Sequence, residues 1–143
     1  AAGQSIVPTT TGAAKALTKI FPDLEHAIGG CGIRVPVPNG SLAILKLELN
    51  TETSVDGLNA VMKKYALEGD LVEQIKYSID NELVSSDIVG SSAPWIYDSN
   101  ATIVAKDGKN VVIYVWYDNE YGYSHQVIRL AKYISKVRRF SYY

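Results

Sequence analysis

The chain contains a single cysteine, Cys31, among its 143 residues. With one cysteine no internal disulfide can form, and a reducing compartment such as the cytoplasm is expected. Cys31 lies between Gly30 and Gly32, and no histidine stands near it in the sequence. An activated thiolate needs a base or a cation beside it. We therefore interpret Cys31 as a small core residue and not as a nucleophile.

An excess of charge of one sign and a long apolar run are also missing. Fourteen basic and fifteen acidic residues give a net charge of −1. This balance gives no reason to expect nucleic acid or an anionic membrane as a partner. No apolar run approaches the ~18–20 residues of a membrane span, and no signal peptide opens the chain. The chain begins without methionine at small, polar residues, so we expect it to be a piece of something longer.

The most informative stretch that is present runs from Val111 to Ser124. Its first seven residues are β-branched or aromatic, which is typical of a strand deep in a sheet. Asp118 or Asn119 then caps a long helix over about 120–137. The side chains expected to face inward are Val127, Leu130, Ala131, Ile134 and Val137. A plain strand-to-helix corner without further function remains the alternative.

The remaining pattern predicts helices and strands in alternation. A helix follows Thr11-Gly12 and ends before Pro22, and another begins at Thr53-Ser54 with Asp56 as a capping-box acid. Its apolar stripe is expected to contain Val55, Leu58, Val61, Met62 and Tyr65. Strands are expected at 32–37, 41–49, 76–79, 83–87, 95–98, 101–105 and 110–117, with hairpin turns at Asn39-Gly40 and Asp107-Gly108.

These elements predict one α+β domain over residues 1–143. It would have two layers, with helices packed on one face of a mostly antiparallel, mixed sheet, and a long C-terminal helix. Thr11 and Gly12 would stand at a helix N-terminus, where free N–H groups and the helix dipole favour an anion. Arg34 on a strand would suit a bidentate phosphate contact. Simple capping by Thr11 and a solvated edge charge at Arg34 are the alternatives.

Three motifs together resemble the phosphorylating glyceraldehyde-3-phosphate dehydrogenases, in their C-terminal, catalytic-domain segment. Residues 116–124, Trp-Tyr-Asp-Asn-Glu-Tyr-Gly-Tyr-Ser, are similar to the signature that opens the last helix of that family. Residues 6–16 resemble its phosphate-binding Thr-Thr-Gly-Ala-Ala-Lys turn, and residues 33–39 resemble its Arg-Val-Pro-x-Pro-Asn strand. The resemblance implies that residues 1–143 belong to the catalytic domain. The NAD-binding domain is absent, because no Gly-x-Gly-x-x-Gly turn occurs.

The resemblance also implies roles for five residues. Thr11 and Gly12 would bind the attacking phosphate, and Arg34 would bridge the phosphate sites of substrate and nucleophile. Asn119 would hold the nicotinamide carboxamide of NAD (or NADP), and Tyr123 would pack near that ring. No catalytic and no metal-binding residue is expected, because the family's Ser-Cys-Thr-Thr-Asn-Cys stretch is missing. Tyr121 and Ala93-Pro94-Trp95 depart from the family's usual residues.

The chain alone is therefore expected to be inactive and to bind no cofactor tightly. Its partners would be phosphate, the triose phosphate, the rest of the same enzyme and further copies in a homotetramer. Two other interpretations stay open from the sequence. The chain could be a standalone or degenerate domain that only binds anions or subunits, or a segment of an erythrose-4-phosphate dehydrogenase.

Overall fold

The computed structural model describes residues 3–137, and its contacts divide the chain into two compact units, residues 1–38 and 39–143. Strands and helices of both units together form an α+β fold, as predicted. The elements gather in two sheets, one of two strands and one of four. Each unit is described below by itself. The expectation of a single domain over residues 1–143 stays a prediction.

The first unit holds one small sheet and one helix. Strand β1 (Val7–Thr9) pairs antiparallel with β2 (Gly32–Arg34), and Val7 stands opposite Arg34. Helix α1 (Ala13–Ile20) ends just before the short 3-10 helix η1 (Pro22–Leu24). Proline at the first position of η1 cannot continue α1, so the predicted stop is confirmed.

The interpretation of Cys31 as a core residue is wrong, because its side chain is exposed. It belongs to the connection between η1 and β2 in a unit whose described residues are all exposed or half-buried. A two-stranded sheet with one eight-residue helix offers no interior in which a thiol could be buried.

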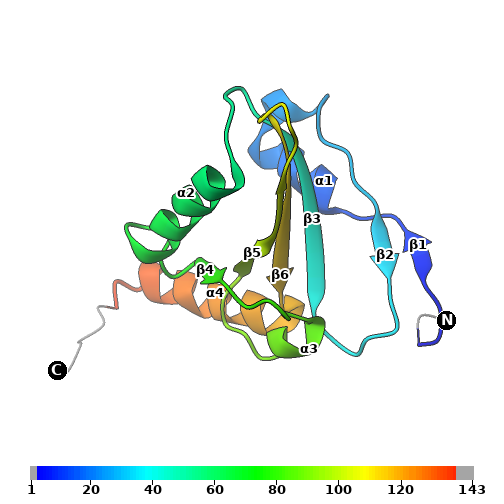
Figure 1. The fold of residues 1–143 in the computed structure, drawn as a ribbon. Helices are drawn as coiled ribbons and strands as arrows, with labels where there is room; N and C mark the ends of the chain where they lie inside the picture. Colours follow the sequence, from blue (N-terminus) through cyan, green and yellow to red (C-terminus); the bar gives the residue numbers. More distant parts are fainter. Residues whose placement is uncertain (1–2, 138–143) are drawn as a thin grey trace. The chain divides into compact units, whose positions relative to one another are not determined.

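The second unit is built on a four-stranded sheet in the order β3-β6-β5-β4 (Figure 1). Its strands are β3 (Ser41–Glu48), β4 (Ile75–Ser78), β5 (Trp95–Val104) and β6 (Asn110–Tyr117). Strand β6 pairs antiparallel with β3 on one side and β5 on the other, whereas β4 and β5 run parallel. The sheet is therefore mixed and mostly antiparallel, and the run from Val111 is its central strand, as predicted.

Two sequence expectations about strands are wrong. The strands expected at 95–98 and 101–105 are one strand, β5, with a register shift between Asp98 and Ile103. The segment expected to be extended at 83–87 forms the short helix α3 (Ser85–Ile88). The N–H of its N-cap residue, Val84, donates to the Asp87 carboxylate at 2.9 Å. Local polar side chains in this segment compete with a ladder for the backbone donors.

The Asn39-Gly40 turn does not join β2 to β3 as a hairpin. β2 pairs with β1, and all eight residues of β3 pair with β6. Pro36 and Pro38 lack the N–H groups that a ladder with β3 would need. A bend at Asn39 is followed by Gly40, which has φ 93°. It leads into β3 without pairing the two strands.

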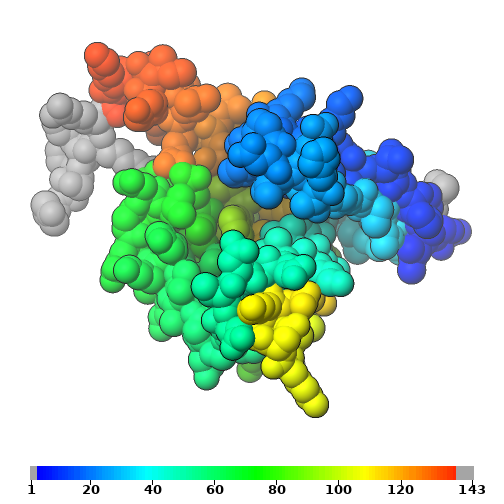
Figure 2. Space-filling model, turned by 90° about the horizontal axis from the view of Figure 1, so that it is seen from above, coloured from blue at the N-terminus to red at the C-terminus, as the bar shows by residue number. Residues whose placement is uncertain are grey.

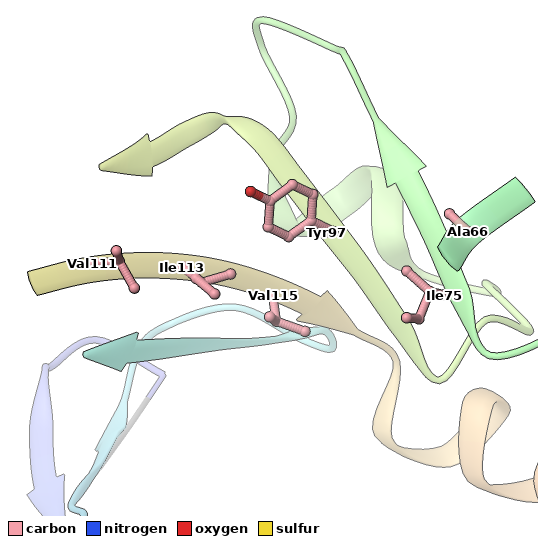
Figure 3. Close-up of a cluster of buried hydrophobic side chains, with 6 residues drawn as sticks. All are labelled: Ala66, Ile75, Tyr97, Val111, Ile113 and Val115. Carbon is pink, nitrogen blue, oxygen red and sulfur yellow. The ribbon is translucent and has the colours of Figure 1, made fainter. Parts of the chain in front are cut away.

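Helix α2 (Val55–Leu67) covers one face of the sheet. Its N-cap is Ser54, whose hydroxyl accepts from Gly57 N–H at 3.1 Å, so the capping box expected from Thr53 is not the one used. Leu58, Met62 and Ala66 pack on a core that contains Ile75, Tyr97, Val111, Ile113 and Val115 (Figure 3). The other three residues of the expected stripe are exposed, Val55 by 37% and Val61 and Tyr65 each by 50%, so that part of the prediction is wrong.

Helix α4 (Asn119–Ile134) turns the opposite way from the prediction. Gly122 is buried, and a Cβ there would lie 3.5 Å from the Ala93 carbonyl oxygen. Further along the helix, Arg129 is half-buried and pairs with Glu73 at 3.0 Å. The side chains expected inward are exposed, with fractions of 48% at Val127 and 70% at Ile134. Helical spacing identified an apolar face, but the residues of α4 that contact the rest of the second unit lie on another face, against Ala93 and Glu73.

The predicted Asp107-Gly108 hairpin joins β5 to β6. Gly108 has φ 68°, and the Asp107 carboxylate accepts from the N–H groups of Lys109 and Asn110. The turn also contacts the segment before α2, because Thr53 N–H donates to the Gly108 carbonyl at 2.8 Å. Figure 2 shows the two segments side by side, in yellow and in blue-green. None of the helices in residues 3–137 is long and apolar enough to cross a membrane.

Candidate functional site

Asp118 lies where β6 ends and α4 begins, and it organises this corner of the second unit. One carboxylate oxygen accepts from the N–H groups of Glu120 and Tyr121, at 3.1 and 2.9 Å, which caps the helix. The other oxygen accepts from the Asn39 side-chain amide at 3.0 Å and from Gly90 N–H at 2.9 Å. Asp118 is 2% exposed. One buried carboxylate thus joins the start of α4 to the segments before β3 and after α3.

These four hydrogen bonds hold the pKa of Asp118 below its usual value. The largest contribution comes from the Gly90 N–H, followed by Tyr121, and the Glu120 N–H and the Asn39 amide add to it against the opposing effect of desolvation. Each donor stabilises the ionised form, and the positive end of the α4 dipole favours it as well. The carboxylate is therefore a fixed anion at neutral pH.

Asn119 is the first residue of α4 and has an exposed side chain. The hydroxyl of Ser41, at the first position of β3, donates to the Asn119 side-chain oxygen. Tyr123 follows Asn119 by four residues and is 71% exposed. Residues four apart share one helix face, so the amide and the phenol ring stand on the same side of α4. Both predicted cofactor-contacting residues are therefore on one exposed surface.

In the first unit, Thr11 lies at the start of α1. Its hydroxyl oxygen accepts from Ala13 N–H at 3.2 Å, and Gly12 is the N-cap without a side-chain cap of its own. A Cβ on Gly30 would lie 3.4 Å from the Thr11 methyl carbon, so the glycine segment before β2 passes close to Thr11. The cap at Thr11 is thus present, together with N–H groups of the first helical turn that have no partner within the helix.

Arg34 is exposed at the end of β2, opposite Val7 of β1. Thr9 stands opposite Gly32 at the other end of this three-pair ladder, and Thr11 follows Thr9 by two residues. About four residue steps separate Thr11 and Arg34, which corresponds to roughly 13 Å along a strand. The Arg34 side chain must therefore extend back along β2 to approach Thr11. That the two side chains share one phosphate site stays a prediction.

The sequence did not predict the contact of Ser41 with Asn119 or that of Asn39 with Asp118. Asn39 ends the Arg-Val-Pro-x-Pro-Asn motif and was given only a turn role, whereas its amide contacts Asp118, 79 residues away. Such contacts depend on β3 lying beside β6, which no local pattern specifies. Among residues 3–137, no three His, Cys, Asp or Glu side chains gather in a group that could hold a metal ion.

Comparison with known proteins identifies the class of protein to which this corner and fold belong. The family described as "Glyceraldehyde 3-phosphate dehydrogenase, C-terminal domain" matches residues 1–119. Curated relatives named glyceraldehyde-3-phosphate dehydrogenase include those of Geobacillus stearothermophilus, 47% identical over 135 residues, and Streptomyces coelicolor, 45% identical over 134 residues. Each alignment covers 94% of this chain and 39% of the relative. A Bacillus subtilis relative, glyceraldehyde-3-phosphate dehydrogenase 1, is 44% identical.

The chain belongs to the C-terminal domain family of glyceraldehyde-3-phosphate dehydrogenases. It spans about two-fifths of the length of the curated relatives given above. The resemblance inferred from the three sequence motifs is thereby confirmed. The relatives' names favour neither the standalone anion-binding domain nor the erythrose-4-phosphate dehydrogenase segment.

Proposed function

We propose that this chain supplies the phosphate-binding and nicotinamide-contacting residues of a phosphorylating glyceraldehyde-3-phosphate dehydrogenase. The observation that supports this most strongly is the corner at Asp118, which fixes Asn119 and Tyr123 together on one exposed face of α4. The whole enzyme would oxidise glyceraldehyde 3-phosphate to 1,3-bisphosphoglycerate, with NAD, or alternatively NADP, as the hydride acceptor. The chain brings no nucleophile to this reaction.

Each residue would contribute by its own chemistry. The Thr11 hydroxyl and the N–H groups at the start of α1 would bind inorganic phosphate, with Gly12 allowing close approach. The Arg34 guanidinium would add charge-assisted contacts between the phosphate sites. Asn119 would donate to the carboxamide of the nicotinamide ring, and Tyr123 would contact the ring through its aromatic face.

The rest of the same enzyme would provide the thiolate, the base and the dinucleotide-binding domain. By resemblance, the assembled protein would be a cytoplasmic homotetramer. The isolated chain should not reduce NAD in the presence of aldehyde and phosphate, because these three parts are not in its sequence. Turnover by the purified 143-residue chain would contradict this division of roles.

The proposal is tested by restoring the missing part. A chimera would join this chain to the segment of the Geobacillus stearothermophilus relative that precedes the aligned region, so that the whole length of that relative is rebuilt. We expect phosphate-dependent reduction of NAD with glyceraldehyde 3-phosphate. Asn119→Ala should raise the KM for NAD at least about tenfold, in line with loss of a buried hydrogen bond to the cofactor. A folded chimera without this activity would refute the proposal.

A further inference from the structure

Strand β3 has one edge that pairs with no other strand of the four-stranded sheet. It is the outer strand in the order β3-β6-β5-β4, so it pairs on one side only, with β6. The Leu49 N–H, just after β3, donates to the carbonyl of Lys109, just before β6, at 2.9 Å. Because successive residues of an antiparallel ladder alternate in direction, the odd-numbered residues of β3 direct their N–H and C=O groups at β6. The even-numbered residues, from 42 to 48, therefore direct theirs at the free edge.

Most of the features that protect an edge strand from further pairing are missing from β3. It contains neither proline nor glycine, and its pairing with β6 runs through all eight residues without a register shift. Helix α2 packs against β4 and β5, which are the strands farthest from β3 in the sheet. Only Lys46 and Glu48 place charges on this strand. A long edge of this kind can pair with a further strand.

The two charges favour one register for antiparallel pairing of β3 with a second copy of itself. When Leu47 lies on the two-fold axis, Lys46 of each copy stands opposite Glu48 of the other, which gives two pairs of opposite charge. A ladder centred on Lys46 would instead bring two lysines together. A ladder centred on Leu45 would place each charge opposite an apolar side chain. Charge complementarity therefore selects the register centred on Leu47.

The same register also pairs leucines on the other face of the strand. Leu45 of each copy would stand opposite Leu49 of the other, and the two copies of Leu47 would face each other. Leu45 and Leu49 are half-buried at the edge of the core, and Leu47 is 39% exposed. Pairing would thus remove leucine surface from water while it satisfies the backbone groups of the free edge.

We propose that the free edge of β3 binds the same edge of a second copy of this chain, antiparallel and centred on Leu47. The two four-stranded sheets then join into one continuous sheet, with the two β3 strands at its centre. Lys46 and Glu48 determine the register on one face, and the leucines fill the other face. The contact uses none of the residues proposed to bind phosphate or nicotinamide, so it does not depend on the proposed function.

The first measurement is disulfide cross-linking of the 143-residue chain in a Cys31→Ser background, because Cys31 is exposed. Leu47→Cys should give a cross-linked dimer under mild oxidation. Directly opposite, non-hydrogen-bonded residues have Cα atoms about 4.5 Å apart, which a disulfide can span. Leu45→Cys is the matched control, because the two copies of residue 45 would lie four residue steps, or about 14 Å, apart. Cross-linking of Leu45→Cys as strong as that of Leu47→Cys would overturn the inference.

This cross-link also distinguishes the edge from the faces of the sheet. Leu47 lies on the same face as Leu45 and Leu49, which pack against the core on the side of α2. A dimer formed through the opposite face would keep the two copies of residue 47 apart. Failure of Leu47→Cys to cross-link while the chain still dimerises would therefore overturn the inference.

The second measurement is a charge exchange, followed by sedimentation equilibrium at low ionic strength. Lys46→Glu and Glu48→Lys should each raise the Kd of the dimer at least about tenfold, because each brings like charges opposite each other at two places. The double variant restores both pairs with reversed signs, so its Kd should return to within about threefold of the unmodified value. A double variant that associates no more tightly than the single variants would overturn the register.

The third measurement is amide hydrogen exchange at several chain concentrations. The N–H groups of Lys46 and Glu48 should exchange more slowly as the dimer forms, whereas those of Leu45 and Leu47 already bond β6 and should change little. Slow exchange of Lys46 and Glu48 in the monomer would show that the chain covers its own edge. That result, or a monomer at every concentration, would overturn the inference.

Discussion

Tyr97 is the largest fully buried side chain of the core, and its hydroxyl is satisfied on both sides. It donates to the Asn59 side-chain oxygen and accepts from the Thr102 hydroxyl, both at 2.7 Å. Burial raises the pKa of Tyr97, with the Thr102 hydrogen bond opposing the shift. The phenol therefore stays neutral and joins α2 to β5 through Asn59.

Tyr97→Phe should lower the free energy of unfolding by about 1–2 kcal/mol, because it leaves the Asn59 oxygen without its donor in a partly buried place. Tyr77→Phe is the matched control, since the Tyr77 ring lies 5.6 Å from the Tyr97 ring. Its effect should remain below about 0.5 kcal/mol. Urea unfolding of both variants measures the difference. Equal losses would show that the Tyr97 hydroxyl contributes no more to stability than the Tyr77 hydroxyl.

Asp118 should make the stability of the second unit depend on pH in the acidic range. Its pKa is lowered in the folded chain by the Gly90 and Tyr121 N–H groups, so the folded state favours the carboxylate. Its contribution is therefore complete above the ordinary aspartate pKa of about 3.9 and is lost as the pH falls through the lower, folded pKa. Thermal unfolding between pH 7 and pH 2 should show this loss.

Asp118→Asn should be less stable than the unmodified chain at pH 7 and should lose less stability on acidification. A side-chain amide keeps one acceptor oxygen but cannot receive four N–H donors as the carboxylate does. The two unfolding curves should therefore approach each other toward pH 2. Parallel curves would contradict the assignment of the acid dependence to Asp118.

At the scale of elements, the β5–β6 turn requires glycine at position 108 for two reasons. Its φ is 68°, and a Cβ there would lie 3.1 Å from the Thr53 carbonyl oxygen. Gly108→Ala should cost about 2–3 kcal/mol, through left-handed strain and displacement of the neighbouring backbone. Gly69→Ala is a matched control, with φ 81° and no atom within 4 Å of the added carbon. It should cost only about 1 kcal/mol in the same chemical denaturation.

If Gly108→Ala and Gly69→Ala cost the same, the contact with Thr53 does not matter and backbone strain alone explains both. The comparison is informative because both glycines have a positive φ in the same unit.

Local patterns predicted the elements whose causes are local. The seven apolar residues before Asp118 specified the central strand, and Asp118 itself was one of two expected caps. The predicted hairpin at Asn39-Gly40 was wrong because strand pairing also involves segments that are distant in the sequence. β3 pairs with β6, up to 76 residues away. Motif resemblance singled out Asn119, but its hydrogen-bond partner Ser41 could not be predicted, since a single serine carries no pattern.

The orientation of α4 also depends on a contact with a distant segment, which local sequence patterns do not specify. Its apolar positions were read correctly from their spacing, yet the buried contact is made at Gly122, which has no side chain to contribute to the pattern. Hydrophobic periodicity identifies the apolar face of a helix, but it does not specify which segment of the protein packs against that helix.

At the scale of the whole molecule, much apolar surface of the second unit is exposed. On the sheet face opposite α2, Leu42 is 38%, Ile44 58% and Ile103 52% exposed. Extended apolar surface of this kind favours association in water. We predict concentration-dependent self-association of the chain, measured by sedimentation equilibrium, and a weakening of at least about tenfold in Ile44→Lys, because a charge would be buried in the contact. A monomer at all concentrations would contradict this prediction.

The most direct test of the proposed phosphate site is a phosphate titration of the 143-residue chain, followed by amide NMR. We predict shifts at Gly12 and Ala13 with a millimolar Kd. Arg34→Ala should remove most of the affinity, and Thr11→Ala should remove less, because the backbone donors at the start of α1 remain. Lys19→Ala, which also removes one positive charge from the first unit, should change the Kd less than about twofold. Equal effects of Arg34→Ala and Lys19→Ala, or no shifts at Gly12 and Ala13, would contradict the site and return Thr11 to the role of a helix cap.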